Sequence, residues 1–273
     1  MKLTLIRGDS ELQLQQLPPD SVDLVVTSPP YFEMRGEMEY GSYPQHLAKM
    51  AAIARGLAVV IKPGRVVVIN VGDYVDSGHV KRPLAADWIK IFEGIPEMQY
   101  EDDIIWEKAF SFGMGAGDRA GMFIKTGFPL YYKPNNTYEH MLIFRKGKLD
   151  YSPFKKGKPS ALEQNKVDYE EFRTHLSDVW HMKNLSSYRE YAAEHIAQFP
   201  PDLPRGFISL YSLPGETVLD PFCGSGTTLE VCREMDRNGI GIELNPDHCK
   251  LTKKRLNWGN SLRDDIVWED KTV

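Results

Sequence analysis

The sequence contains little cysteine and none of the cysteine patterns that bind zinc or build a disulfide framework. Of its 273 residues only Cys223, Cys232 and Cys249 are cysteines, and no CxxC pair occurs. The seven histidines are scattered, without a metal-ligand spacing such as HExxH. An odd number of unpaired cysteines is typical of a reducing compartment. We therefore expect a cytoplasmic protein that binds no metal.

Long apolar runs and an excess of positive charge are also missing. No uninterrupted apolar stretch approaches the roughly 20 residues that cross a membrane. Arg7 and Asp9 follow the first apolar residues at once, so we expect no secretory signal and no membrane partner. With a net charge of -5, a nucleic-acid-binding role would require local clusters of basic residues. The 273 residues fit one large α/β domain with an insertion better than two full domains, and an apolar content of 42% is enough for a sizeable core.

A proline pair interrupts the chain after the apolar segment Asp23–Val26, in the stretch Thr27-Ser28-Pro29-Pro30-Tyr31. Prolines cannot donate backbone hydrogen bonds or continue a strand. We therefore expect a stiff shelf at the C-terminal end of a strand, where open α/β sheets carry their sites. A hydroxyl, an outward carbonyl and an aromatic ring there suit a flat ring that bears an amino group. Taken alone, the stretch is equally well explained as a strand-to-loop turn.

A second stretch, Val218–Thr228, places a glycine turn between a short apolar strand and a helix that we expect to begin near Thr227. Glycines let the backbone approach a ligand, and a helix N-terminus offers free N–H groups. No lysine precedes Thr227, so this is not a Walker A loop, and Leu229 replaces the third glycine of the dinucleotide fingerprint. The next expected strand ends in Glu243, which suits a ribose-binding carboxylate.

The two stretches together resemble motifs of the S-adenosylmethionine-dependent DNA amino-methyltransferases. In that family a (D/N/S)PPY motif holds the target base and an FxGxG motif holds the cofactor. Because the catalytic motif comes first here, the order resembles the permuted β class. The resemblance covers nearly the whole chain apart from a middle segment. It implies a Rossmann-like α/β methyltransferase fold: a mostly parallel, twisted sheet flanked by helices, with circularly permuted motifs and a small inserted target-recognition segment.

The resemblance divides this domain into a catalytic half at 1–145, a target-recognition insertion at 146–178 and a cofactor-binding half at 179–273. Basic residues gather at the start of the insertion in an otherwise acidic chain. They would neutralise phosphates of double-stranded DNA, although such a run is usually only a solvated surface. No known sequence-reading module is visible, so the recognition sequence is not specified. The expected DNA contacts are Arg145, Lys146, Lys148, Lys155, Lys156 and Lys158.

S-adenosylmethionine is the cofactor that the resemblance implies, with S-adenosylhomocysteine as product. Asp9 would contact its adenine, although an aspartate at this place caps the following helix about as often. His195–Pro200 resembles the element that binds the methionine end, with Ile196 where the family often has proline. The expected cofactor-binding residues are Asp9, Thr27, Phe199, Asp220, Phe222, Gly224, Ser225, Gly226, Thr227, Thr228, Glu243 and Asn245.

The catalytic residues that the resemblance implies are Ser28, Pro29, Pro30 and Tyr31. The Ser28 hydroxyl and the Pro29 carbonyl would accept the two N–H bonds of an exocyclic amino group, and Tyr31 would stack on the base. An amino group inside a duplex cannot reach the cofactor in line, so base flipping is implied. No cysteine has the setting of a nucleophile, which argues against methylation of cytosine C5.

Serine at the first position of the motif is associated within the family with cytosine N4, and aspartate more with adenine N6. We therefore expect a DNA (cytosine-N4) methyltransferase, with adenine N6 as the alternative and a cognate restriction endonuclease as a candidate partner. Ser28 makes an RNA or protein substrate less expected, because asparagine at this position of the motif would have indicated one. A non-catalytic binding protein and an unrelated nucleotide-binding enzyme remain as further alternatives, and the second leaves TSPPY unexplained.

Two other features receive no catalytic assignment. His140 lies beside an expected strand, where a lone histidine is usually structural. The glycine-rich stretch 111–127 predicts either an irregular insertion or a loop that DNA orders.

Overall fold

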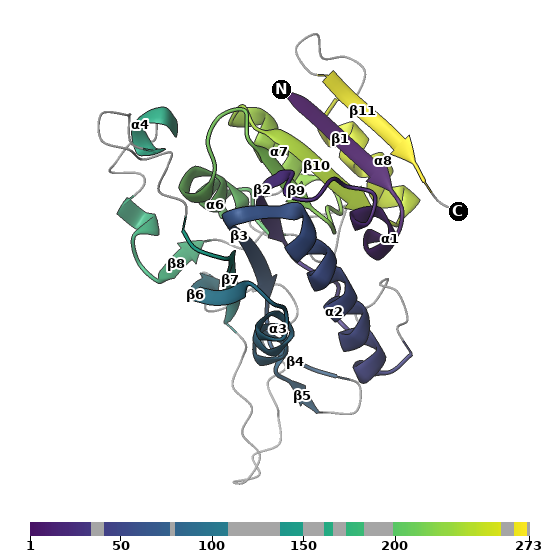
Figure 1. Cartoon of the computed structure of the whole chain (residues 1–273), viewed down its shortest axis with the longest axis vertical. Helices are drawn as coiled ribbons and strands as arrows, with labels where there is room; N and C mark the ends of the chain where they lie inside the picture. Colours follow the sequence, from purple (N-terminus) through teal and green to yellow (C-terminus); the bar gives the residue numbers. More distant parts are fainter. Residues whose placement is uncertain are drawn as a thin grey trace, which may run out of the picture.

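A large β-sheet with helices on both faces forms the centre of the computed structural model, which describes residues 1–33, 41–76, 80–108, 137–149, 161–165, 173–182, 199–257 and 265–271 (Figure 1). The strands of this sheet are β1 (Lys2–Arg7), β2 (Val22–Thr27), β3 (Ile61–Val71), β6 (Met98–Lys108), β7 (Tyr138–Lys146), β8 (Val179–Met182), β9 (Thr217–Asp220), β10 (Asn238–Glu243) and β11 (Asp265–Asp270). A small hairpin pairs β4 (Tyr74–Val75) with β5 (Lys81–Arg82).

The strand order across the sheet is β11-β1-β10-β9-β2-β3-β7-β6-β8. Strand β7 is antiparallel to both of its neighbours, and the other described pairings of this nine-stranded sheet are parallel. β2 and β9 lie side by side at the centre, although Thr27 at the end of β2 and Asp220 at the end of β9 are 193 positions apart. This mixed, mostly parallel sheet flanked by helices confirms the expected fold class.

Helices cover the two faces in two separate groups. One apolar cluster packs α1 (Ser10–Leu14), α2 (Tyr43–Val60) and α3 (Leu84–Glu93) against the sheet, through residues such as Leu14, Met50 and Trp88. The other cluster packs α6 (Asp202–Tyr211), α7 (Thr227–Glu234) and α8 (Pro246–Arg255) on the opposite side, through Phe207, Leu229 and others. The helix after β2 and the helix after β9 therefore lie on opposite faces, which makes the β2–β9 junction the topological switch point of the sheet.

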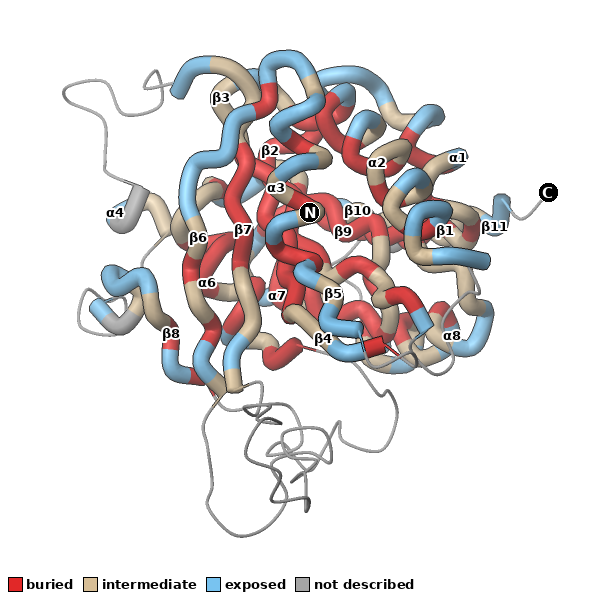
Figure 2. The backbone as a smooth tube through the Cα atoms, turned by 90° about the horizontal axis from the view of Figure 1, so that it is seen from below, coloured by how far each residue is buried: buried red, intermediate tan, exposed pale blue. Residues whose placement is uncertain are grey.

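The central strands form because their sequences are apolar and β-branched. All six residues of β2 are buried, as are Val66–Val71 of β3, which suits strands that are covered on both faces. In Figure 2 these strands run through the buried middle of the molecule, and exposed backbone lies at its rim. The helix expected near Thr227 does begin there, as α7.

Parts of the expected insertion 146–178 pack on the core. Lys146 is the last residue of β7, and α4 (Ala161–Asn165) contacts α6. The short helix η2 (Arg173–His175) places the His175 ring edge-on against Trp180 of β8. The division of the chain at 145 and 178 remains a prediction.

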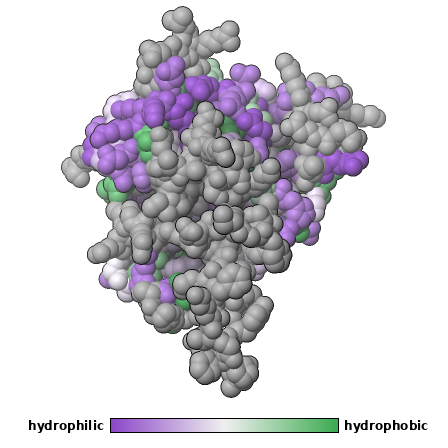
Figure 3. Space-filling model, turned by 180° about the vertical axis from the view of Figure 1, so that it is seen from behind, coloured by the Kyte–Doolittle hydropathy of each residue, from purple (hydrophilic) through white to green (hydrophobic). Residues whose placement is uncertain are grey.

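On the face shown in Figure 3, the described residues are mostly hydrophilic, with a few scattered hydrophobic ones. Within the described part of the chain, no helix combines the length and the apolar character needed to cross a membrane.

Candidate active site

The two motifs meet at the C-terminal edge of the central strands. Strand β2 ends at Thr27, so Ser28 begins the proline shelf at this edge. Strand β9 ends at Asp220, and the glycine loop leads from there into α7. Because β2 and β9 pair in parallel, the shelf and the loop are neighbours in space. The tertiary structure thus brings together the expected catalytic and cofactor residues from the two ends of the chain.

A buried carboxylate links the two motifs directly. Thr27 Oγ1 donates to Asp220 Oδ1 at 2.6 Å, and Thr228 Oγ1 donates to Asp220 Oδ2 at 2.6 Å. The Phe222 N–H adds a third hydrogen bond to Oδ1 at 3.1 Å. Burial raises the pKa of Asp220 to about 6, against the effect of these three donors. The polar atoms of Thr27, Asp220 and Thr228 therefore bind one another, and the cofactor contacts expected of their side chains remain predictions.

The backbone of the glycine loop takes conformations that favour glycine. Gly224 and Gly226 have φ values of 53° and 84°. A Cβ atom on Gly226 would lie 2.6 Å from Thr252 Cγ2, so the loop also packs too closely on α8 for a larger residue. Ser225 is buried, and its hydroxyl has no hydrogen-bond partner within the described structure. An orphaned buried hydroxyl in a tight glycine loop fits a loop that binds a polar ligand.

Glu243 stands where a ribose-binding carboxylate is expected. It is the last residue of β10; its Oε2 accepts from Gly224 N at 2.9 Å and its Oε1 from Asn245 N at 2.7 Å. Each carboxylate oxygen keeps further acceptor capacity. Together with the Ser225 hydroxyl and the N-terminus of α7, this donor and acceptor set fits S-adenosylmethionine, which would bring an electrophilic methyl group on a sulfonium.

The remaining expected cofactor residues occupy varied places around this loop. Asn245 caps α8 by accepting from Asp247 N at 2.8 Å, and Thr227 Oγ1 accepts from Arg255 Nη1 at 2.5 Å. Phe199 is buried in the cluster under α6, whereas Phe222 is half-buried against the opposite cluster.

Asp9 lies beside Glu243 and caps a helix. Arg7 pairs with Glu243 across β1 and β10, and the Gly8 N–H donates to the Glu243 carbonyl at 3.0 Å. The Asp9 carboxylate accepts from Glu11 N at 2.9 Å at the start of α1 and forms an ion pair with Lys49 at 2.9 Å. The capping alternative is thus observed, and its place next to Glu243 is compatible with an adenine contact as well. No motif in the sequence pointed to Lys49.

The Tyr31 side chain is fixed by residues that follow β3. Its hydroxyl accepts from Gly72 N at 2.6 Å, and its ring stacks on that of Tyr74 with centroids 5.6 Å apart and planes inclined by 24°. Ser28 and Pro30 are half-buried and Pro29 is buried. Gly72 and Tyr74 were missed from the sequence, where a Gly-Asp pair at the end of a strand reads simply as a turn.

His140 lies at the same edge of the sheet as Tyr31. It pairs across the ladder with Val71, the last residue of β3. Its Nδ1 is 2.7 Å from Asp103 Oδ2, and this hydrogen bond raises the pKa of the imidazole. A carboxylate on the neighbouring strand β6 thus explains the histidine without a catalytic role.

Two of the expected DNA-contacting residues lie at the opposite edge. Strand β7 runs antiparallel, so Arg145 and Lys146 at its end lie near the start of β3. Arg145 Nε forms an ion pair with Glu101 at 2.9 Å, and Lys146 Nζ forms one with Asp20 at 2.6 Å. The structure does not bring these two side chains to Ser28. Lys148 is exposed close to them, and Lys155, Lys156 and Lys158 lie outside the described residues, as do His195 and the stretch 111–127.

Comparison with known proteins places this site in a family. The family model N6_N4_Mtase, a DNA methylase, matches residues 22–254. The Type II methyltransferase M.XycI of Xanthomonas campestris pv. cyanopsidis is 30% identical, over 94% of this chain and 89% of the relative. The Type II beta methyltransferase M.BslI of Bacillus sp. (strain NEB-606) is 31% identical over 93% of this chain, which spans 27% of that longer protein.

Solved structures agree with this placement. TTHA0409 of Thermus thermophilus, described as a putative DNA modification methylase and complexed with S-adenosyl-L-methionine, superposes with a TM-score of 0.73 at 25% identity, covering 97% of this chain and 99% of its own. The PvuII DNA methyltransferase (cytosine-N4-specific) shares the fold with a TM-score of 0.70 at 19% identity, covering 96% and 88%. The chain therefore belongs to the N6/N4 DNA methylase family, and it is an amino-methyltransferase of DNA that uses S-adenosylmethionine.

Proposed function

We propose that this protein methylates the exocyclic N4 amino group of cytosine in duplex DNA at a specific sequence. The observation that carries this proposal is Ser28, which stands at the first position of the proline shelf and next to the glycine loop. The structurally similar PvuII enzyme is cytosine-N4-specific, which agrees with this choice but shares the fold alone. Adenine N6 is the second candidate, because the site accepts an amino group of either base.

In the proposed reaction the residues of the shelf bind and orient the amino group. Ser28 Oγ and the Pro29 carbonyl accept its two N–H bonds, which turns the nitrogen lone pair toward the methyl group. S-adenosylmethionine would supply the methyl group to the amino nitrogen, and the electron pair of the methyl–sulfur bond would remain on sulfur. The proton that the methylated nitrogen loses would pass to solvent. Tyr31 supports the flipped base by stacking.

Serine and aspartate differ chemically at this position. An aspartate would add negative charge and act as a stronger acceptor, whereas a serine hydroxyl can both donate and accept. Ser28→Ala removes the proposed acceptor, and we expect it to lower kcat by about tenfold or more with little change in cofactor affinity. Ser28→Thr keeps the hydroxyl and is the matched control.

The decisive experiment is methyl transfer from labelled S-adenosylmethionine to mixed-sequence duplex DNA, followed by digestion and mass analysis of the nucleosides. N4-methylcytosine supports the proposal. N6-methyladenine would overturn the choice of base and leave the family reaction intact. The same methylated DNA, mapped by sequencing, would give the recognition site.

We also propose DNA contacts and a cognate restriction endonuclease as partner. The relatives are named Type II methyltransferases, which supports such a pairing. Arg145 and Lys146 are paired with carboxylates far from Ser28. We therefore propose Lys148, Lys155, Lys156 and Lys158 as the residues that contact DNA phosphates. Reversal of these four lysines to glutamate should weaken DNA binding and flatten its salt dependence, whereas the Lys146→Gln control should not.

A further inference from the structure

The pairing between β2 and β9, which we call the central seam, joins the two halves of the active site. β2 carries the proline shelf and β9 carries the glycine loop. The ladder of the seam is short, with the partners Leu24↔Val218 and Val25↔Leu219. Backbone hydrogen bonds alone therefore give this junction few constraints, although the alignment of methyl donor and acceptor depends on it.

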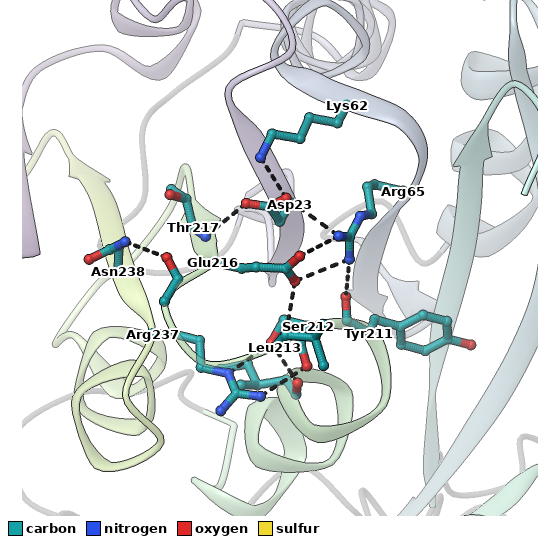
Figure 4. A network of polar contacts seen from close by, with 12 residues as sticks. Asp23, Lys62, Arg65, Tyr211, Ser212, Leu213, Glu216, Thr217, Arg237 and Asn238 are labelled. Carbon is teal, nitrogen blue, oxygen red and sulfur yellow. Dashed lines mark hydrogen bonds and ion pairs between the residues drawn. The ribbon is translucent and has the colours of Figure 1, made fainter. Parts of the chain in front are cut away.

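An aspartate bridges the central seam at each end. At the edge away from the site, Asp23 of β2 accepts from Thr217 N of β9 at 3.0 Å. Figure 4 shows this bridge, in which Lys62 at 2.7 Å and Arg65 at 3.6 Å compensate the buried charge. At the site edge the roles are reversed, because Asp220 of β9 accepts from Thr27 of β2.

The two bridges differ in their electrostatics. Asp220 is 2% exposed, and among the described residues no cation forms an ion pair with it. The titratable groups that face it are Glu243 of β10 and the thiols of Cys223 and Cys232, and none of them supplies positive charge. A buried carboxylate without a cation is costly, so this one contributes less to stability than Asp23 does.

What Asp220 supplies instead is orientation. A carboxylate only accepts hydrogen bonds, so it holds both threonine hydroxyls as donors. Thr27 precedes Ser28 directly, and Thr228 lies in the first turn of α7 behind the cofactor loop. One side chain thus fixes the end of the proline shelf relative to the loop that holds the cofactor.

We propose that Asp220 is a positioning residue that sets the distance and alignment between the methyl donor and the acceptor amino group, rather than a ligand of the cofactor. The inference rests on the proposed function in one respect: the amino group must bind at Ser28. It holds for either base. A misplacement of reacting groups by about 1 Å can cost about a hundredfold in rate, so the loss of this bridge should act on kcat.

The test compares Asp220→Asn with Asp23→Asn, which alters the other end of the same two strands. We expect Asp220→Asn to lower kcat by about tenfold or more, with affinities for S-adenosylmethionine and DNA changed by about twofold at most. Its thermal stability at neutral pH should be equal or higher, because a buried charge without a cation is removed. Asp23→Asn should lose stability through its ion pairs and keep its kcat per folded molecule.

A pH profile supplies a second readout. In the wild type, protonation of Asp220 below about pH 6 turns one acceptor into a donor, so kcat should fall there. This fall of kcat at acidic pH should be absent in Asp220→Asn. Thr27→Val removes one arm of the bridge and should lower kcat, and Thr27→Ser, which keeps the hydroxyl, should restore it. These threonine variants keep the proposal testable if Asp220→Asn does not fold.

Three results would overturn the proposal. The first is an unchanged kcat in Asp220→Asn, and the second is a loss of cofactor affinity that accounts for the whole effect, which would make Asp220 a cofactor ligand. The third is an equal loss of kcat in Asp23→Asn, which would assign the effect to general loosening of the seam. All are read on whichever base the wild type methylates, so a failure of the cytosine assignment is separately visible.

Discussion

Tyr31 combines a ring and a hydroxyl that are held by different neighbours. The hydroxyl accepts from Gly72 N, and the ring stacks on Tyr74. We expect Tyr31→Phe to keep the ring and lower kcat slightly, and Tyr31→Ala to lower it by about tenfold or more because base stacking is lost. Steady-state kinetics together with direct titration of S-adenosylmethionine checks this. A parallel collapse of cofactor affinity in Tyr31→Ala would contradict the stacking role.

The pKa of His140 depends chiefly on one neighbouring carboxylate. The hydrogen bond to Asp103 is the largest cause of the raised pKa. We therefore expect Asp103→Asn to lower the pKa of His140, since its protonated form loses its counter-charge. Imidazole signals followed by NMR across the acidic and neutral pH range measure the shift. His46, whose pKa burial lowers to about 4, is the internal reference and should not move.

Contacts between residues that are close only in the folded chain could not be predicted from the sequence. Thr27, Asp220 and Thr228 were expected to touch the cofactor, and the hydrogen bonds among their side chains were not expected. Thr27 and Asp220 are 193 positions apart, and no spacing rule in the sequence reports such a contact. The strand end at Glu243 and the turns at Gly224 and Gly226 could be read from the sequence, because strand ends and left-handed glycines have local signatures. Their contacts with the cofactor remain predictions.

At the level of elements, we propose that the last residue of β10, Glu243, contributes to the affinity for the cofactor. Glu243 holds the N–H groups of Gly224 and Asn245 and keeps acceptor capacity for ribose hydroxyls. We expect Glu243→Gln to weaken S-adenosylmethionine binding by about tenfold, because amide hydrogen bonds are weaker than those of a carboxylate. Asp247→Asn, a matched loss of one carboxylate at an exposed position on α8, is the control. Equal affinities in both variants would contradict the ribose assignment.

Strand direction explains why two of the expected DNA-contacting residues lie far from Ser28. The basic cluster was visible in the sequence, but the direction of β7 was not. An antiparallel β7 carries Arg145 and Lys146 away from Ser28, toward Glu101 and Asp20. Strand β11 was also missed, because Asp265–Asp270 mixes acidic and apolar residues and is a strand only through its pairing with β1.

At the scale of the whole molecule, one buried arginine ties the inserted segment to the core. Arg237 is 1% exposed, donates to Asn165 Oδ1 of α4 and binds Ser212 O at 2.9 Å. We expect Asn165→Ala to lower the free energy of unfolding by about 1–3 kcal/mol, since a buried charged donor loses one of its acceptors. Chemical denaturation measures this. A change below about 0.5 kcal/mol, as at an ordinary surface site, would contradict the role of Asn165 as an anchor.

The amino-acid sequence by itself determined the central strands, the proline shelf, the glycine loop and the family, because each depends on residues that are neighbours in the chain. β-Branched runs select buried strands, a proline pair stops a strand, and glycines permit left-handed turns. Only the tertiary structure decided which motif side chains touch and which edge of the sheet each charge reaches. Those outcomes depend on strand order, strand direction and burial, which arise when β2 and β9, far apart in the chain, pair at the central seam.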